Sequence, residues 1–487
     1  MRPTLAALIA ILAATVALVA QAPAQPAAAP PLLLTHVNVV DVVAGAVRRD
    51  QDVVVRGGEI ASVAAAGAAA PAGARTIDGT GKFLVPGLAD MHVHWYDERY
   101  LGLFVANGVT TVRQMWGFPM HFTWLGRIER GDLLAPRMHI ASAIVDGPNP
   151  VWPNSTVVDD PADAAKVVGA IKAGGFDFVK VYSRLSKDAF LAIAKAAREN
   201  DIPFAGHVPP SISAAEASDA GQKSIEHMTG ILLASSSDEA KLRERSISLF
   251  KGGEASQGIS AETRVALREL SEALLATYDP AKASVLFAKL AKNGTWMSPT
   301  LVVLRSMSSL DDAAFTADPR VKYMPKQLRD GWNPANDPRN ATKSAADYAI
   351  ERRVFKKNVE VLGAMHKAGV RVIAGTDVLN PFAFPGFSLH DELALLVGAG
   401  LSRADALRAA TINPAIFMGT EKTAGTIEAR KNADLVLLDA NPLDDIANTK
   451  RIAAVVARGR FLDRAALDAI LANAEKISTP AAAAVKH

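Results

Sequence analysis

The chain of 487 residues contains no cysteine. This absence excludes disulfide bonds, thiolate metal ligands, a cysteine nucleophile and lipid attachment at a signal-peptide cysteine. Any metal site must therefore use histidine, carboxylate or modified lysine side chains.

An excess of positive or negative charge is absent as well. The formal net charge is only +3, and no run of lysine and arginine marks a nucleic-acid-binding surface. No GxGxxG sequence leads from a strand into a helix, which excludes a dinucleotide site of that type. We therefore expect no nucleic-acid partner.

Long apolar runs are absent except at the N-terminus. Residues 5–20 are apolar and are followed by the Ala/Pro/Gln-rich stretch "QAPAQPAAAPP". The pattern predicts a signal peptide over residues 1–24 and an exported protein, periplasmic or secreted, with an uncleaved anchor as the alternative. No other stretch is long enough to span a bilayer, so we expect no stable membrane span after signal cleavage.

The two ends of the mature chain resemble each other in composition. Residues 32–43 and 51–63 are rich in β-branched residues, and residues 424–439 and 451–463 repeat this pattern. We predict a small β-sandwich built from residues 25–82 and 421–487.

Between these ends, residues 83–420 alternate strand-like apolar runs with helical patterns. The eight predicted strands are 83–94, 109–115, 137–145, 176–182, 202–208, 223–228, 295–303 and 370–378. Eight βα units predict an α/β fold, a TIM-like (β/α)8 barrel. Two insertions, 229–294 and 304–343, are predicted to form a lid over the catalytic face; a surface that forms a homo-oligomer is the alternative.

Polar residues recur where the predicted strands end, which is where the catalytic groups of such a barrel gather. His92 and His94 in "HVH" lie on one face of the first strand. His207, His227 and Asp377 end the fifth, sixth and eighth strands. Four imidazoles and a carboxylate are a suitable ligand set for zinc-like metals.

Lys180 lies inside the apolar strand "FDFVKVY". A buried lysine loses its proton readily, because burial disfavours the charged form. The neutral amine can react with carbon dioxide to give a carbamate whose two oxygens bridge two metal ions. A buried ion pair with Asp377 is the alternative.

These motifs resemble the amidohydrolase superfamily, in the binuclear branch with a bridging, carbamylated lysine. The resemblance covers nearly the whole mature chain, through "VPGLADMHVH", "VKVY", "GHV", "SIEH", "AGTD" and "GTIEARKNADLVLLDANPL". It is similar to exported prolidase-like and imidazolonepropionase-related hydrolases. The resemblance implies two divalent metal ions, with zinc expected, bound by the following residues. His92, His94 and Asp377 hold the more buried ion, His207 and His227 hold the more exposed one, and N-carboxylated Lys180 bridges them.

We expect such a site to use a metal-bridging hydroxide, with Asp377 as the catalytic proton acceptor. Tyr182 is expected to donate a hydrogen bond to the substrate or to be a core residue, and His390 to contact the substrate or to lie at a helix end or surface. Arg113 and Arg184 are expected to lie at the surface or to form ion pairs, with a substrate-carboxylate clamp as the alternative. Glu226 is expected to point away from the site, since it precedes His227 on a strand.

The sequence thus predicts a metal-dependent hydrolase of amide bonds in small-molecule substrates, namely dipeptides or N-acyl amino acids. Lactones, esters, carbamates and cyclic amides are alternative substrates for the same site. A non-catalytic metal-binding protein is a remote alternative, because all six ligand positions are filled. The remaining histidines, expected to be structural or exposed, are His36, His121, His139, His366 and His487.

Overall fold

The computed structural model describes residues 30–67, 69–250 and 258–479. The predicted signal peptide and His487 lie outside these ranges. Within them, no helix has both the length and the apolar character needed to cross a membrane.

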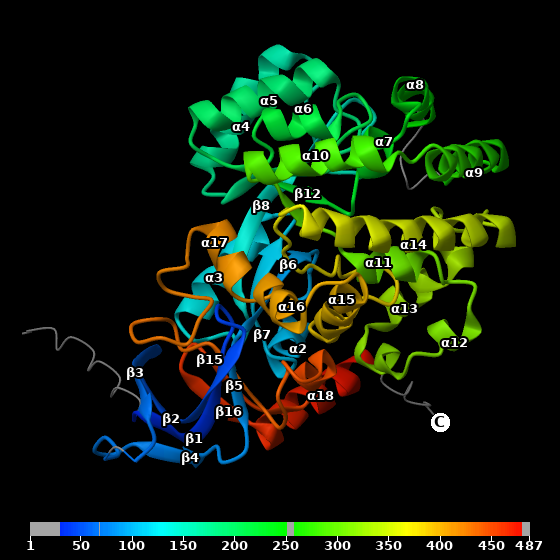
Figure 1. Ribbon diagram of the computed structural model, residues 1–487. Helices are drawn as coiled ribbons and strands as arrows, with labels where there is room; N and C mark the ends of the chain where they lie inside the picture. The colour runs from blue at the N-terminus through cyan, green and yellow to red at the C-terminus, as the bar shows by residue number, and fades with distance from the viewer. Residues whose placement is uncertain (1–29, 68, 251–257, 480–487) are drawn as a thin grey trace, which may run out of the picture.

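The middle of the chain forms a ring of short parallel strands (Figure 1). Seven named strands pair in the order β13-β12-β11-β10-β8-β7-β6. In chain order they are β6 (Leu88–Val93), β7 (Val109–Gln114), β8 (Arg137–Asp146), β10 (Phe178–Val181), β11 (Phe204–Gly206), β12 (Ser224–Glu226) and β13 (Trp296–Ser298). The short β9 (Thr156–Val157) pairs with β8 outside this ring. The predicted barrel is confirmed.

The predicted eighth strand is present only as two isolated bridges. Val372 pairs with Met297 and Val378 pairs with Val93, so residues 370–378 close the ring between β13 and β6. A side chain at Gly375 would place its Cβ 2.8 Å from the Cβ of His92. Glycine therefore permits the close approach that brings this segment against β6.

The predicted strand 83–94 is in fact two strands that serve different sheets. β5 (Phe83–Pro86) belongs to the sheet of the chain ends, and β6 begins the barrel. Gly87 separates them, and a Cβ at this position would lie 2.0 Å from Thr110 Oγ1. The apolar run is continuous because both strands are buried, which hides the boundary from the sequence pattern.

Both chain ends join one sheet, as expected, shown at the lower left of Figure 1. Its strand order is β16-β15-β14-β5-β1-β2-β3, with β4 paired to β1. The strands are β1 (Leu32–Asp41), β2 (Ala46–Arg56), β3 (Glu59–Ala65), β4 (Arg75–Asp78), β14 (Leu435–Leu438), β15 (Ile452–Ala457) and β16 (Arg460–Asp463). The two ends meet where β5 pairs antiparallel with β14.

Helices cover the outside of the barrel and fill the two insertions. The crossover helices include α4 (Ala164–Ala173), α5 (Lys187–Glu199), α6 (Ala214–Asp219), α10 (Pro280–Asn293), α14 (Ala345–Lys367), α15 (Phe387–Gly398) and α16 (Arg403–Ala409). The Ser402 side chain caps the N-terminus of α16. The first insertion contains α7 (Ile231–Ala234), α8 (Glu239–Phe250) and α9 (Ala261–Ala276), and the second contains α12 (Ala313–Thr316) and α13 (Lys326–Trp332).

Candidate metal centre

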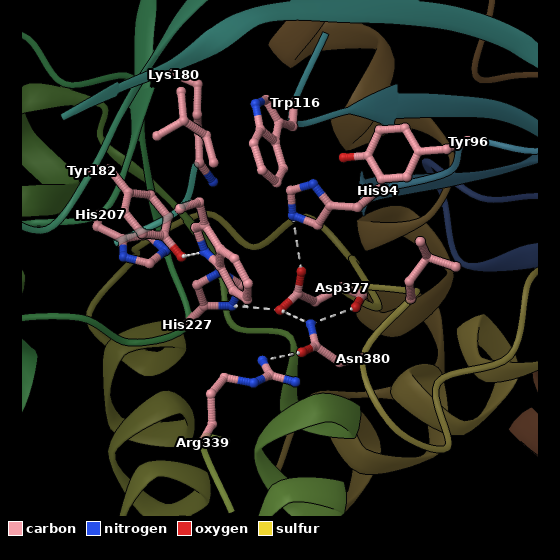
Figure 2. Close-up of a pocket in the computed structure, with 13 residues that line it drawn as sticks. His94, Tyr96, Trp116, Lys180, Tyr182, His207, His227, Arg339, Asp377 and Asn380 are labelled. Carbon is pink, nitrogen blue, oxygen red and sulfur yellow. Dashed lines mark hydrogen bonds and ion pairs between the residues drawn. The ribbon is translucent and has the colours of Figure 1, made fainter. Parts of the chain in front are cut away.

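A cavity of about 290 Å³ lies where the barrel strands end (Figure 2). Five of the six predicted metal ligands line it, namely His94, Lys180, His207, His227 and Asp377. His92, the sixth, is fully buried beside them, with its Nε2 3.2 Å from His94 Nε2. The fold thus brings together all six residues, although their role as ligands stays a prediction.

One half of the constellation is formed by the "HVH" pair and Asp377. Asp377 Oδ1 lies 3.4 Å from His92 Nε2 and 3.1 Å from His94 Nε2. One donor atom from each of His92, His227 and Asp377 lies within 4.8 Å of the others, a spacing that a single ion can span. Burial holds the pKa of His92 well below its ordinary value, so its imidazole is neutral and able to bind a metal.

The other half is formed by His207 and His227, whose rings lie 5.0 Å apart. Burial lowers the pKa of His227 to about 4 and that of His207 well below its ordinary value. His227 and Asp377 both have φ of 56°, in the left-handed region that costs energy for residues other than glycine. Such strain is typical of functional sites, where the surrounding structure fixes the side-chain direction.

Lys180 extends from β10 into the cavity and is completely buried. Within the described residues its Nζ atom has no hydrogen-bond partner, so the alternative of a buried ion pair with Asp377 is not formed. Burial lowers the pKa of Lys180 to about 8. An amine in this state is available for carboxylation near neutral pH.

Tyr182 lies in the cavity wall, stacked on His207 with ring centroids 3.9 Å apart. Its hydroxyl oxygen accepts a hydrogen bond of 2.9 Å from Trp152 Nε1. Because the oxygen accepts this bond, the phenolic proton remains available for another acceptor. Burial raises the pKa of Tyr182, which keeps that proton in place.

His390 lies elsewhere, and the expectation of a substrate contact is corrected. It is buried within α15, where its Nε2 lies 3.0 Å from the Asn107 carbonyl and its Nδ1 lies 3.0 Å from Thr449 Oγ1. Both ring nitrogens therefore connect α15 to neighbouring segments. The sequence could not reveal this, because both partners are far away along the chain.

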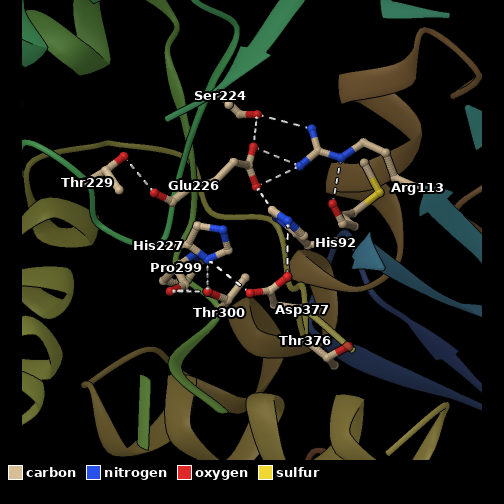
Figure 3. A network of polar contacts seen from close by, with 12 residues as sticks. His92, Arg113, Ser224, Glu226, His227, Thr229, Pro299, Thr300, Thr376 and Asp377 are labelled. Atoms are coloured by element: carbon tan, nitrogen blue, oxygen red, sulfur yellow. Dashed lines mark hydrogen bonds and ion pairs between the residues drawn. The ribbon is translucent and has the colours of Figure 1, made fainter. Parts of the chain in front are cut away.

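Glu226 also requires a correction. Its side chain is fully buried and reaches His92, with its Oε2 2.8 Å from His92 Nδ1 (Figure 3). The strict alternation of a strand fails here because β12 ends at Glu226 and His227 turns with its positive φ. Arg113 forms the ion pair expected of it, with Glu226, and does not line the cavity. Arg184 binds Asp146 through its backbone N–H and the Asn149 carbonyl through its side chain.

The fold brings further residues to the cavity that the sequence analysis did not single out. Asn380 donates a hydrogen bond of 2.8 Å to Asp377 Oδ2 and accepts one of 3.1 Å from Arg339. Arg339 comes from the second insertion, which therefore contributes to the cavity wall, whereas the described residues of the first insertion do not. Asn380 lies three residues after Asp377, so proximity in sequence is the one signal that could have indicated it.

The cavity has an aromatic side as well. Tyr96 and Trp116 form it, with their rings 6.3 Å apart and nearly perpendicular. The Tyr96 hydroxyl and Trp116 Nε1 are buried and have no hydrogen-bond partner among the described residues. A buried donor without a partner costs about 1–3 kcal/mol, so both atoms are candidates for contact with a bound molecule.

The other histidines lie outside this cavity. His36 is exposed and pairs with Asp50, and His121 packs against Tyr96 from behind. His139 in β8 and His366 in α14 are partly buried.

A model of the amidohydrolase family matches residues 83–462, which include the barrel and most of the C-terminal strands. The chain belongs to the amidohydrolase family. Family membership indicates a hydrolase.

Solved structures and curated proteins place this amidohydrolase among several relatives. It is similar to a bottromycin amidohydrolase, with 27% identity, a TM-score of 0.73 and coverage of 92% of this chain and 90% of the other. A putative prolidase from Bifidobacterium longum shares the fold, with 23% identity, a TM-score of 0.61 and coverage of 91% and 99%. An imidazolonepropionase from Shouchella clausii (strain KSM-K16) is 45% identical over 78 residues, which span only 16% of this chain and 17% of that enzyme.

Proposed function

We propose that this amidohydrolase is an exported, binuclear metal-dependent enzyme that hydrolyses amide C–N bonds in dipeptides or N-acyl amino acids. The observation that carries the proposal is the buried Lys180 amine, which has no hydrogen-bond partner among the described residues and lies in one cavity with histidines and Asp377. The fold shared with a putative prolidase is consistent with a peptide-like substrate.

The residues fit a pair of divalent ions. His207 Nε2 is buried and has no hydrogen-bond partner in the described part of the chain, as expected of a nitrogen whose lone pair binds a metal. Lys180 would become a ligand if its neutral Nζ formed a bond to the carbon of carbon dioxide, with one C=O bond converted to C–O− and one of the two amine protons released to solvent. Zinc is the expected metal, because the site offers nitrogen and oxygen ligands. Two such ions, when bound, would supply Lewis acidity and lower the pKa of bound water.

Asp377 is suited to move the proton. Burial alone would raise the pKa of this carboxyl group, but His227, His94 and Lys180 hold it below its ordinary value. The side chain is therefore ionised and able to accept the proton of the attacking water, then deliver it to the leaving amine. Asn380 orients the carboxylate by its bond to Oδ2, which leaves Oδ1 directed at the imidazoles.

Tyr182 is suited to bind the carbonyl oxygen of the scissile bond. Trp152 satisfies its oxygen, and the phenolic proton then points to an acceptor on the substrate. A neutral donor placed this way stabilises the negative charge that develops on that oxygen.

The cavity walls are consistent with a small substrate that carries an apolar side chain. Ile144 and Leu379 supply aliphatic contacts, and Tyr96 and Trp116 supply aromatic ones. The Tyr96 hydroxyl and Trp116 Nε1 can also donate hydrogen bonds, because neither has a partner among the described residues. N-acyl amino acids and dipeptides contain both the apolar side chain and the acceptor oxygens that such walls would bind.

The test begins with the number of metal ions per chain in protein purified without chelators, beside Lys180→Ala. We expect about two ions in the wild type, a clear loss in the variant, and hydrolysis of dipeptides or N-acyl amino acids. One ion or none, unchanged in Lys180→Ala, would contradict the bridged site. Turnover of ester or lactone analogues, with none of amides, would replace the proposed substrate class.

A further inference from the structure

Glu226 supports the metal centre from below the cavity. Its Oε2 lies 2.8 Å from His92 Nδ1, and both side chains are completely buried. A carboxylate accepts hydrogen bonds and does not donate them, so the neutral imidazole carries its proton on Nδ1. His92 Nε2 is thereby left with a lone pair that faces Asp377 and His94.

A fully satisfied network fixes Glu226 in place (Figure 3). Arg113 donates to both carboxylate oxygens at 2.9 Å, and Ser224 donates a further hydrogen bond to Oε1. Arg113 also donates to the Met91 carbonyl, one residue before His92. The same arginine thus positions both the carboxylate and the strand that carries the imidazole.

Aromatic rings hold Arg113 itself. Its guanidinium carbon lies 4.9 Å from the ring centre of Phe417 and 5.5 Å from that of Phe178. The arginine is fully buried. The buried ion pair of Arg113 and Glu226 has one favourable geometry, because displacement of either side chain would leave a buried charge without its partner.

The histidines in the other half of the site form hydrogen bonds with neutral hydroxyls instead, although His227 Nδ1 also lies 3.8 Å from Asp377 Oδ2. His207 Nδ1 lies 2.8 Å from Ser183 Oγ, and His227 Nδ1 lies 2.6 Å from Thr300 Oγ1. Hydroxyls also orient an imidazole, but they do not add negative charge behind it. A carboxylate makes the ligating nitrogen more basic and commonly changes metal affinity by about 10- to 100-fold.

We propose that Glu226, held by Arg113 and Ser224, is a positioning residue that fixes His92 as an Nε2 ligand and makes the His92–His94–Asp377 position the tighter of two unequal metal positions. This inference rests on the proposed function, because it requires that the site bind metal. It assigns a purpose to Glu226, Arg113 and Ser224, none of which lines the cavity.

The test titrates metal-free protein with zinc in competition with a chromogenic chelator, which yields two dissociation constants. In Glu226→Gln the smaller constant should rise by about 10- to 100-fold, while the larger one changes little. The matched variant Ser183→Ala, which removes the hydroxyl behind His207, should affect mainly the larger constant. Equal constants in the wild type, or an unchanged smaller constant in Glu226→Gln, would overturn the proposal.

A second variant separates positioning from folding. Glu226→Gln leaves Arg113 buried without its counter-ion, whereas Arg113→Met with Glu226→Gln removes both charges. The double variant should recover thermal stability relative to the single one and still show the raised dissociation constant. Recovery of both stability and zinc affinity would show a purely structural role and overturn the proposal.

The tautomer gives a readout that does not need metal or activity. Two-bond ¹⁵N–¹H spectra of the metal-free protein should show His92 protonated on Nδ1, with the signal identified by its loss in His92→Asn. The opposite tautomer would overturn the proposal. If the wild type binds no zinc at all while His92 shows the expected tautomer, the proposed metal function fails and the positioning geometry stands.

Discussion

The sheet formed by the chain ends and the interior of the barrel are both buried, yet they differ in what they bury. The core of the sheet is aliphatic, with Leu34, Val53, Leu84 and Leu435 fully enclosed. The barrel interior encloses charged and titratable side chains without exposure to solvent, namely Asp90, His92, Arg113, Lys180 and Glu226.

The difference separates a sheet whose core supplies stability alone from a barrel that has an apolar core of its own and also supplies the chemistry. Aliphatic burial stabilises a fold at about 25 cal/mol per Å² and requires no specific partner. Buried charge is costly unless every partner is present, so the barrel interior tolerates little change. Substitutions in the two regions should therefore affect different measurements.

Asp377→Asn should give the largest effect. The amide keeps the size of the side chain but cannot accept the proton, so kcat should fall by about 10²- to 10⁴-fold at saturating metal. Asp439→Asn, which removes a carboxylate of the sheet that pairs with Lys82, is the control and should leave kcat unchanged. If Asp377→Asn retained more than about a tenth of kcat, Asp377 would not be the proton acceptor.

Leu84→Ala should lower stability and leave chemistry intact. Leu84 is fully buried in β5, and truncation of such a side chain costs about 2–5 kcal/mol. Chemical denaturation should show this loss, while kcat per folded molecule stays the same. Val285→Ala, at a side chain that is 71% exposed, should change neither. A large loss of kcat in Leu84→Ala would show that the two regions are not separable.

The carboxylation of Lys180 should follow the pKa of about 8 that burial gives it. The amine is charged below this pH and reactive above it. At constant dissolved carbon dioxide, the initial rate of ¹³C incorporation into metal-free protein should rise about fivefold from pH 7 to 8 and level off above about pH 9, because the rate follows the fraction of neutral amine. A rise of about tenfold per pH unit through pH 9 would indicate an ordinary, exposed lysine. Lys180→Ala should give no signal.

Tyr96→Phe should give the smallest effect. Removal of one donor to the substrate costs about 0.5–1 kcal/mol, which predicts a rise in KM of about two- to fivefold. Tyr278→Phe, a partly buried tyrosine outside the cavity, is the control. An unchanged KM would mean that the Tyr96 hydroxyl does not contact the substrate.

Much of this architecture was predictable from local pattern. The strand-end positions of His207, Lys180 and Asp377 follow from counting βα units, and the barrel brings them into one cavity. The joining of the two chain ends in one sheet was predictable from their matching β-branched composition. The strand that links them, β5, was predicted as part of the first barrel strand instead.

What could not be predicted depends on contacts across the fold. Strand alternation placed Glu226 away from the site, but alternation stops where the backbone of His227 turns. The bonds of His390 reach Asn107 and Thr449, which no spacing rule connects. Arg339 comes to the cavity from an irregular insertion whose path depends on packing.

The pairing of β5 with β14 also determines when the chain can finish folding. Leu84 lies opposite Leu437, so more than 350 residues separate two neighbouring strands. Contacts this distant in sequence form late, because a long loop must close first. During synthesis β5, which precedes the "HVH" segment, stays unpaired on one edge until almost the whole chain has been made. Molecules interrupted before residue 435 would therefore expose an apolar strand edge, which is a recognised starting point for aggregation.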